Sequence, residues 1–142
     1  MSETRPVVPV VAVGAFIFDG AGRVLLVERG RPPGAGLWTV PGGRVESRET
    51  LVAAVAREVL EETGLVVEVG ALVTVVERMG DDHHFVILDY LAAITGGMLS
   101  AASDARAARF VDDVELATLP LTDGLLSVLA QARATHAACA SR

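Results

Sequence analysis

The chain has 142 residues, of which 51% are hydrophobic and 21% are charged, and its formal net charge is -6. This length and composition indicate one globular domain with its own core and exclude an intrinsically disordered chain. The acidic balance, without any long run of Lys or Arg, disfavours binding to duplex nucleic acid, which needs a concentrated basic face.

The first residues show no signal-peptide pattern, because Arg5 is followed by a proline-containing stretch and then by a strand-like run. The apolar stretch at residues 7–18 contains Pro9 and Gly14 and is too short to span a bilayer. The single cysteine, Cys139, cannot form an intramolecular disulfide. We therefore expect a cytoplasmic protein that does not enter a membrane.

Strands and turns are expected in the first third of the chain. Residues 10–18 read as a strand, residues 19–22 (Asp-Gly-Ala-Gly) have turn chemistry, and residues 24–27 read as a second strand. This order predicts a β-hairpin. A loop is expected at residues 30–36. Residues 41–43 (Pro-Gly-Gly) predict a further break, where the backbone adopts conformations closed to other residues.

The period of the hydrophobic residues becomes helical from about Glu49 to Thr63. Apolar side chains recur there at four-residue spacing: Leu51, Val55 and Val59. Gly64 stands where a left-handed residue commonly ends a helix.

Three strand-like runs follow, at residues 65–76, 85–94 and 109–111, and then a helix from residue 122 to about residue 136. Strands with helices in the middle and at the end predict an α/β sandwich, with helices on both faces of a mixed sheet. We expect a single domain over residues 1–142, with loose tails at residues 1–6 and 137–142.

Glutamates continue the apolar line of the middle helix instead of opposing it. At 100° per residue, Glu58 and Glu62 lie within about 40° of each other and share the azimuth of Leu51 and Val55. Two ionised carboxylates about 5.5 Å apart, at an effective dielectric constant of 20, repel by roughly 3 kcal/mol. Glu61 on the flank increases this repulsion. Either some of these carboxyl groups are protonated, or a cation binds between them.

Hard oxygen ligands without a His or Cys cluster suit Mg²⁺ or Mn²⁺. Mg²⁺ usually completes its shell with water and substrate phosphate, and a bound cation lets an acidic enzyme act on a polyanion. Flexible backbone at Gly42 and Gly43 would bring a carbonyl up as a further ligand. The alternative interpretation of the glutamates is a solvated acidic helix face.

Residues 43–65 resemble a complete Nudix box. Its elements stand at the family's spacing: Gly43, Glu49, Arg57-Glu58-Val59, Glu61-Glu62 and Gly64-Leu65. The flanking strand order, with Trp38 and Pro41 before the glycines, also resembles the family. The resemblance implies the Nudix fold, an α/β/α sandwich with a mixed β-sheet. It also implies Mg²⁺-dependent hydrolysis of a nucleoside diphosphate linked to another moiety.

The same resemblance implies roles for the residues of the box. Glu58 and Glu62 would be the principal metal ligands, helped by the Gly43 carbonyl, and Glu61 would be a further or water-bridged ligand. A glutamate would take the proton of the attacking water, and Glu58 is our choice, although some family members use a carboxylate outside the box.

Two further box residues would support the glutamates. Arg57, which can pair with Glu61 four residues later, would orient the glutamates. Glu49 would serve as an outer-shell partner of the metal site. Its alternative role is a favourable charge in the first turn of the helix, and both roles are compatible.

Residues outside the box are candidates for substrate binding. Arg29 and Arg44 can reach phosphates or remain surface charges, and Trp38 either stacks on a base or belongs to the core. Asp104 lies in a loop where many family members place an additional acidic ligand or base. Those members have glutamates near the following Arg-Phe pair, whereas this chain has alanines and Arg106.

The segment Asp89-Tyr90 resembles that of ADP-ribose-pyrophosphatase-like members, so the expected substrate is ADP-ribose or a similar small nucleotide conjugate. A pyrophosphatase of nucleoside triphosphates, removing oxidised or non-standard nucleotides, is the alternative. A non-catalytic nucleotide-binding module is a third hypothesis, disfavoured because no box glutamate is lost. Homodimers are common in the family, and one is compatible with this chain.

Overall fold

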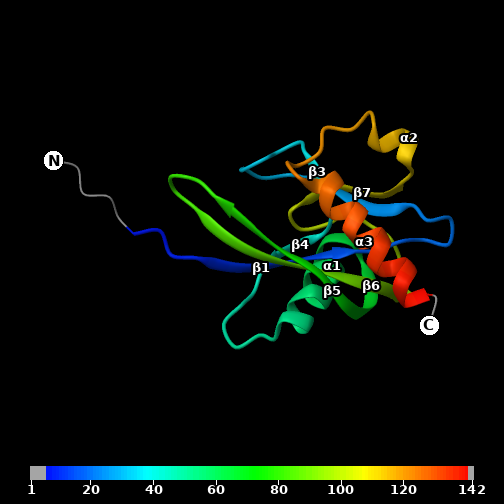
Figure 1. Ribbon diagram of the computed structural model, residues 1–142, viewed down its shortest axis with the longest axis horizontal. Helices are drawn as coiled ribbons and strands as arrows, with labels where there is room; N and C mark the ends of the chain where they lie inside the picture. The colour runs from blue at the N-terminus through cyan, green and yellow to red at the C-terminus, as the bar shows by residue number, and fades with distance from the viewer. Residues whose placement is uncertain (1–5, 141–142) are drawn as a thin grey trace.

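The computed structural model describes residues 6–140, so residues 1–5 and 141–142 of the expected tails lie outside it. Within that range, no helix combines the length and the hydropathy needed to cross a bilayer. The elements follow in chain order (Figure 1): β1 (Val10–Phe16), β2 (Val24–Arg29), β3 (Trp38–Thr39), β4 (Gly42–Arg44), α1 (Leu51–Thr63), β5 (Leu65–Met79), β6 (His84–Gly97), β7 (Ala105–Val111), α2 (Asp113–Leu116) and α3 (Leu125–Ala140).

The strands form two sheets. The larger sheet has the strand order β4-β1-β6-β5. It is mixed, because β1 runs parallel to β6 while the β4–β1 and β6–β5 pairs are antiparallel. The smaller is antiparallel, with the order β3-β2-β7. The predicted turn between β1 and β2 is present, but the prediction that the two strands pair as a hairpin is wrong. The turn forms, and Phe18 bridges to Val24, but β1 then pairs with β6 along its whole length while β2 joins the other sheet.

Hydrophobic side chains fill two layers on opposite sides of the sheets. Successive residues of a strand face opposite sides, so Val13 and Ala15 of β1 pack in one layer with Val59 of α1. Phe16 packs in the other layer with Leu129 of α3. Helices α1 and α3 therefore cover different faces, with the strands between them (Figure 1). This arrangement confirms the predicted α/β/α sandwich with a mixed sheet.

Local capping signals explain where α1 begins and ends. The Thr50 hydroxyl accepts a hydrogen bond from the Ala53 N–H at 3.1 Å, so the helix begins at Leu51. Gly64 has φ 75° and donates its N–H to the Leu60 carbonyl, which confirms the predicted left-handed ending. Glu49 precedes the cap, so the interpretation of Glu49 as a first-turn charge is wrong.

Helix α3 begins and ends later than the sequence predicts. Gly124, with φ 78°, precedes its first residue, Leu125, and the helix continues beyond His136 to Ala140. Residues 137–140 of the expected tail are therefore helical. The alanine-rich sequence of this stretch favours a helix even where its side chains are exposed.

Candidate active site

The last two turns of α1 bring Glu58 and Glu62 against strand β4. Only 7% of Glu62 is exposed, and its Oε1 accepts a hydrogen bond from the Gly42 N–H at 2.8 Å. The Glu58 side chain is 14% exposed and lies so close to Gly43 that a Cβ there would come within 2.5 Å of its carboxyl carbon. Both carboxylates thus follow the buried line of the helix, as their spacing predicts.

Gly42 and Gly43 serve a different purpose from the one predicted. Both belong to β4, and neither has the positive φ that only glycine adopts readily. A Cβ at Gly42 would collide with the Val13 carbonyl, and a Cβ at Gly43 would collide with Glu58. The prediction of unusual backbone conformations is therefore wrong. Glycine is needed here because it allows a strand on one side and a carboxylate on the other to approach the backbone.

Arg57 connects the acidic residues through its three guanidinium nitrogens. Its Nε and Nη2 donate to the two carboxylate oxygens of Glu49 at 2.6 and 2.8 Å. Its Nη1 donates to Glu58 at 2.9 Å and to Glu61 at 3.2 Å, which confirms the predicted pair with Glu61. Its Nη2 also donates to the Arg44 carbonyl of β4 at 3.0 Å. Arg57 therefore joins the helix, β4 and the preceding loop.

Burial and like charges alter the acidity of these groups. Burial raises the pKa of Glu62 to about 7, with further contributions from the charges of Glu58 and Asp104, against the hydrogen bond from Gly42. Burial also raises the pKa of Glu58, against the opposing effect of Arg57. The hydrogen bond from Arg57 lowers the pKa of Glu49 to about 2. The metal-free site thus disfavours ionisation of Glu58 and Glu62, which a cation would reverse.

Within residues 6–140, no three His, Cys, Asp or Glu side chains converge closely enough to form a metal centre by themselves. Each box glutamate instead turns to an internal donor, Glu62 to the Gly42 N–H and Glu58 and Glu61 to Arg57. Mg²⁺ commonly takes only one or two protein carboxylates and adds water and substrate phosphate. The carboxylate oxygens of Glu58 and Glu62 and the carbonyl oxygen of the adjacent Gly43 are ligands of the kind that Mg²⁺ prefers.

The structure brings Arg29 and Asp104 to the same site. The Arg29 charge opposes the rise in the pKa of Glu62, and the Asp104 charge contributes to the rise at both Glu58 and Glu62. Asp104 pairs with Arg31 at 3.0 Å. Backbone hydrogen bonds place the loop, because Ala102 donates to the Glu62 carbonyl and Gly30 donates to the Asp104 carbonyl. The family resemblance had made Asp104 a candidate, although the neighbouring alanines and Arg106 depart from the family pattern.

The side chains of two other substrate candidates lie against an aromatic ring or in the core. Trp38 is 8% exposed and packs in the core layer of α3, with the Arg109 guanidinium 5.0 Å from its ring. This burial favours the core alternative over stacking on a base. The side chain of Arg44 is exposed, 5.6 Å from the ring centre of Phe85.

Asp89 is a buried carboxyl group whose burial is not evident from the sequence. It is 6% exposed, and burial raises its pKa to about 6. It lies opposite Gly14 of β1, where a Cβ would collide with its carboxylate. A glycine inside one apolar strand and an aspartate inside another were the available signals, but their pairing depends on the register of β1 with β6.

A family model described as the NUDIX domain matches residues 8–131. The ADP-ribose pyrophosphatase of Methanocaldococcus jannaschii is 38% identical over 106 residues, which are 73% of this chain and 62% of that protein. The human 8-oxo-dGDP phosphatase NUDT18 is 42% identical over 84 residues, which are 59% of this chain but only 25% of that protein. The crystal structure of a MutT NUDIX hydrolase from Burkholderia pseudomallei has a TM-score of 0.74 and 32% identity, covering 87% of this chain and 97% of that one. This chain thus spans under two thirds of either curated relative.

Proposed function

Because the chain belongs to the Nudix family, we propose that it hydrolyses the pyrophosphate linkage of a small nucleoside diphosphate conjugate with the help of Mg²⁺. The observation that carries the proposal is the packing of Glu58 and buried Glu62 along β4, with glycine backbone against both carboxylates. Like charges in such confinement favour a bound cation. Mn²⁺ has the same preference for oxygen ligands and is the alternative metal.

In this proposal Glu58, Glu62 and the Gly43 carbonyl hold the metal, and Glu61 holds it directly or through water. If Mg²⁺ is bound there, it would supply charge neutralisation for the phosphates and a water of lowered pKa. Glu58 accepts the proton of the attacking water, while Arg57 orients the Glu58 carboxylate through the 2.9 Å hydrogen bond. Glu49 holds the guanidinium of Arg57 from the other side. We propose that Arg29, whose charge acts on Glu62, contacts a phosphate.

Asp104 is the carboxylate outside the box that lies within electrostatic reach of both glutamates. We propose it as a further metal ligand or as the alternative proton acceptor. Its pairing with Arg31 leaves its side chain 56% exposed, so it is accessible to a bound substrate. Comparing Asp104→Asn with Glu58→Gln over a range of pH would separate the two candidates, because loss of the base removes the acidic limb of the rate profile.

Two substrate classes remain candidates. The relative from Methanocaldococcus jannaschii is named an ADP-ribose pyrophosphatase, which supports a nucleotide conjugate of that type. The human relative is named an 8-oxo-dGDP phosphatase, which supports the alternative of oxidised nucleotides. Both classes present a diphosphate and a base, so the glutamate site suits either.

The test is incubation with Mg²⁺ and a panel of ADP-ribose, nucleotide sugars, dinucleotides, 8-oxo-dGDP and nucleoside triphosphates, with products identified by mass spectrometry. Reaction in ¹⁸O-labelled water would identify the phosphorus that is attacked. We expect cleavage of at least one diphosphate compound and loss of most turnover in Glu62→Gln. Binding of nucleotides without any product would contradict the enzymatic proposal and favour a binding module.

A further inference from the structure

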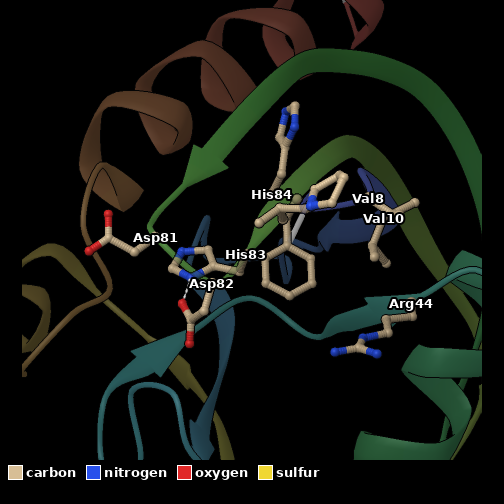
Figure 2. Close-up of a pocket in the computed structure, with 10 residues that line it drawn as sticks. Val8, Val10, Arg44, Asp81, Asp82, His83 and His84 are labelled. Carbon is tan, nitrogen blue, oxygen red and sulfur yellow. Dashed lines mark hydrogen bonds and ion pairs between the residues drawn. The ribbon is translucent and has the colours of Figure 1, made fainter. Parts of the chain in front are cut away.

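An open groove of about 580 Å³ borders the proposed active site, and none of the steps above uses it. Its walls come from the segment leading into β1, from β4 and from the turn between β5 and β6. Figure 2 shows Val8, Val10 and Arg44 on one side of this groove and Asp82 and His83 on the other. The volume is typical of small-molecule sites.

Flat side chains gather in the groove. The Arg44 guanidinium carbon lies 5.6 Å from the ring centre of Phe85. The rings of His83 and Phe85 are 5.7 Å apart and tilted by 31°. Val8, which is 73% exposed, adds an apolar rim. Guanidinium and aromatic planes beside exposed apolar surface are the groups on which nucleic-acid bases stack.

Strand β4 joins the groove to the glutamates. Gly43 lies against Glu58, and Arg44 follows it on the opposite face, because successive strand residues face opposite sides; Gly43 pairs with Val13 of β1 and Arg44 pairs with Ala12. Phe85 pairs with Val10, two strands from β4. Phe85 is therefore displaced from Gly43 by three residues along the strand direction and by two strands across the sheet. These offsets correspond to ~14 Å between the backbones of the two residues. A nucleotide extended from its base to its terminal phosphate spans a distance of this order.

We infer that this groove binds the base of the substrate nucleotide, stacked against Phe85 and Arg44. The diphosphate of the same nucleotide then reaches around β4 to the glutamates. This inference rests on the proposed function. The charges favour this orientation over the reverse one. Asp81 and Asp82 are exposed in the wall opposite Arg44 and would repel a phosphate. The same carboxylates accept hydrogen bonds from the amino groups of a base.

The test compares two probes by calorimetry in the presence of Mg²⁺: ADP, and methylenediphosphonate, which has two phosphorus groups but no base. We expect Phe85→Ala to weaken ADP binding about tenfold or more and to leave methylenediphosphonate binding unchanged. Phe85→Tyr should retain ADP binding. Unchanged ADP affinity in Phe85→Ala would overturn the inference, and so would an equal loss for both probes.

Phe18→Ala is the matched control. Phe18 is also half-buried, with the Arg133 guanidinium 5.2 Å and the His136 ring 5.0 Å from it, but it lies outside the groove. We expect its removal to leave ADP affinity unchanged. If Phe85→Ala does not fold, NMR of the wild-type protein provides the second measurement. Nuclear Overhauser effects between the adenine protons and the Phe85 ring are expected, and contacts confined to other residues would overturn the inference.

These measurements separate the inference from the proposed function. A protein that binds ADP through Phe85 but cleaves no diphosphate compound would refute the function and retain the base site. A protein that cleaves nucleotides with the same KM in Phe85→Ala as in wild type would retain the function and refute the base site.

Discussion

Replacing Glu62 by Gln should stabilise the metal-free protein while destroying its activity. The Gln carbonyl can still accept the 2.8 Å hydrogen bond from the Gly42 N–H, and the side chain keeps its size and its burial at 7% exposure. Only the charge disappears. Because burial disfavours that charge and the charge of Glu58 adds to the penalty, its removal should raise the free energy of unfolding.

The magnitude follows from the pKa of Glu62, which rises from 4.5 to about 7 on folding. At 1.36 kcal/mol for each pH unit between these values, ionisation costs the folded state about 3 kcal/mol. Below pH 4.5 the carboxyl group is protonated in both states and the cost is absent. It grows as the pH rises through this window and is complete above pH 7. The variant should therefore match wild type near pH 4 and exceed it at pH 8, with a melting temperature higher on the order of 10 °C.

The assay is thermal and urea unfolding at several pH values in the presence of EDTA. The pKa of Asp89 also rises on folding, so ionisation of Asp89 lowers the stability of wild type and variant alike as the pH rises. The difference in unfolding free energy between the two proteins therefore isolates the contribution of Glu62. Glu61→Gln, at a side chain 46% exposed, is the control and should give little difference. A Glu62→Gln protein less stable than wild type at pH 8 would refute the repulsion argument. Adding Mg²⁺ with a nucleotide should stabilise wild type more than the variant.

Three further predictions test the positions of individual residues. Gly43→Ala should abolish turnover, because its Cβ displaces Glu58, whereas Gly20→Ala, where a Cβ meets no atom within 4 Å, should be neutral; initial rates and circular dichroism check both. Arg57→Lys keeps the charge but loses the forked hydrogen bonds, so activity should fall about 10- to 100-fold with a higher Mg²⁺ requirement, measured by metal titration. Trp38→Phe should lower stability by about 1–2 kcal/mol while leaving KM unchanged, since Trp38 packs in the core; a large rise in KM would restore a substrate contact.

The helix and its glutamates could be predicted because their signals are local. The apolar period and Gly64 are properties of neighbouring residues, and the azimuth of Glu58 and Glu62 follows from helical geometry alone. The first residue of the helix depends on the Thr50 cap, which leaves Glu49 outside the helix. Glu49 instead forms an ion pair with Arg57, which the sequence did not predict.

Features that depend on long-range pairing could not be predicted. The turn predicted at residues 19–22 suggests a hairpin, but the pairing of β1 with β6 decides which sheet β1 joins. Strands of two or three residues, such as β3 and β4, are too short to show a period. Trp38 has the same sequence neighbours whether it packs or stacks. Only the position of α3 and the second sheet decides between the two.

The segment from residue 98 to residue 104, between β6 and β7, is attached along its length. Ser100 and Ala102 donate backbone hydrogen bonds to the last carbonyls of α1, and Asp104 accepts one from Gly30. Insertion or deletion of a single residue would break one of these attachments and move Asp104 relative to the helix. Directed evolution of this protein should therefore vary the side chains of the segment and keep its length constant.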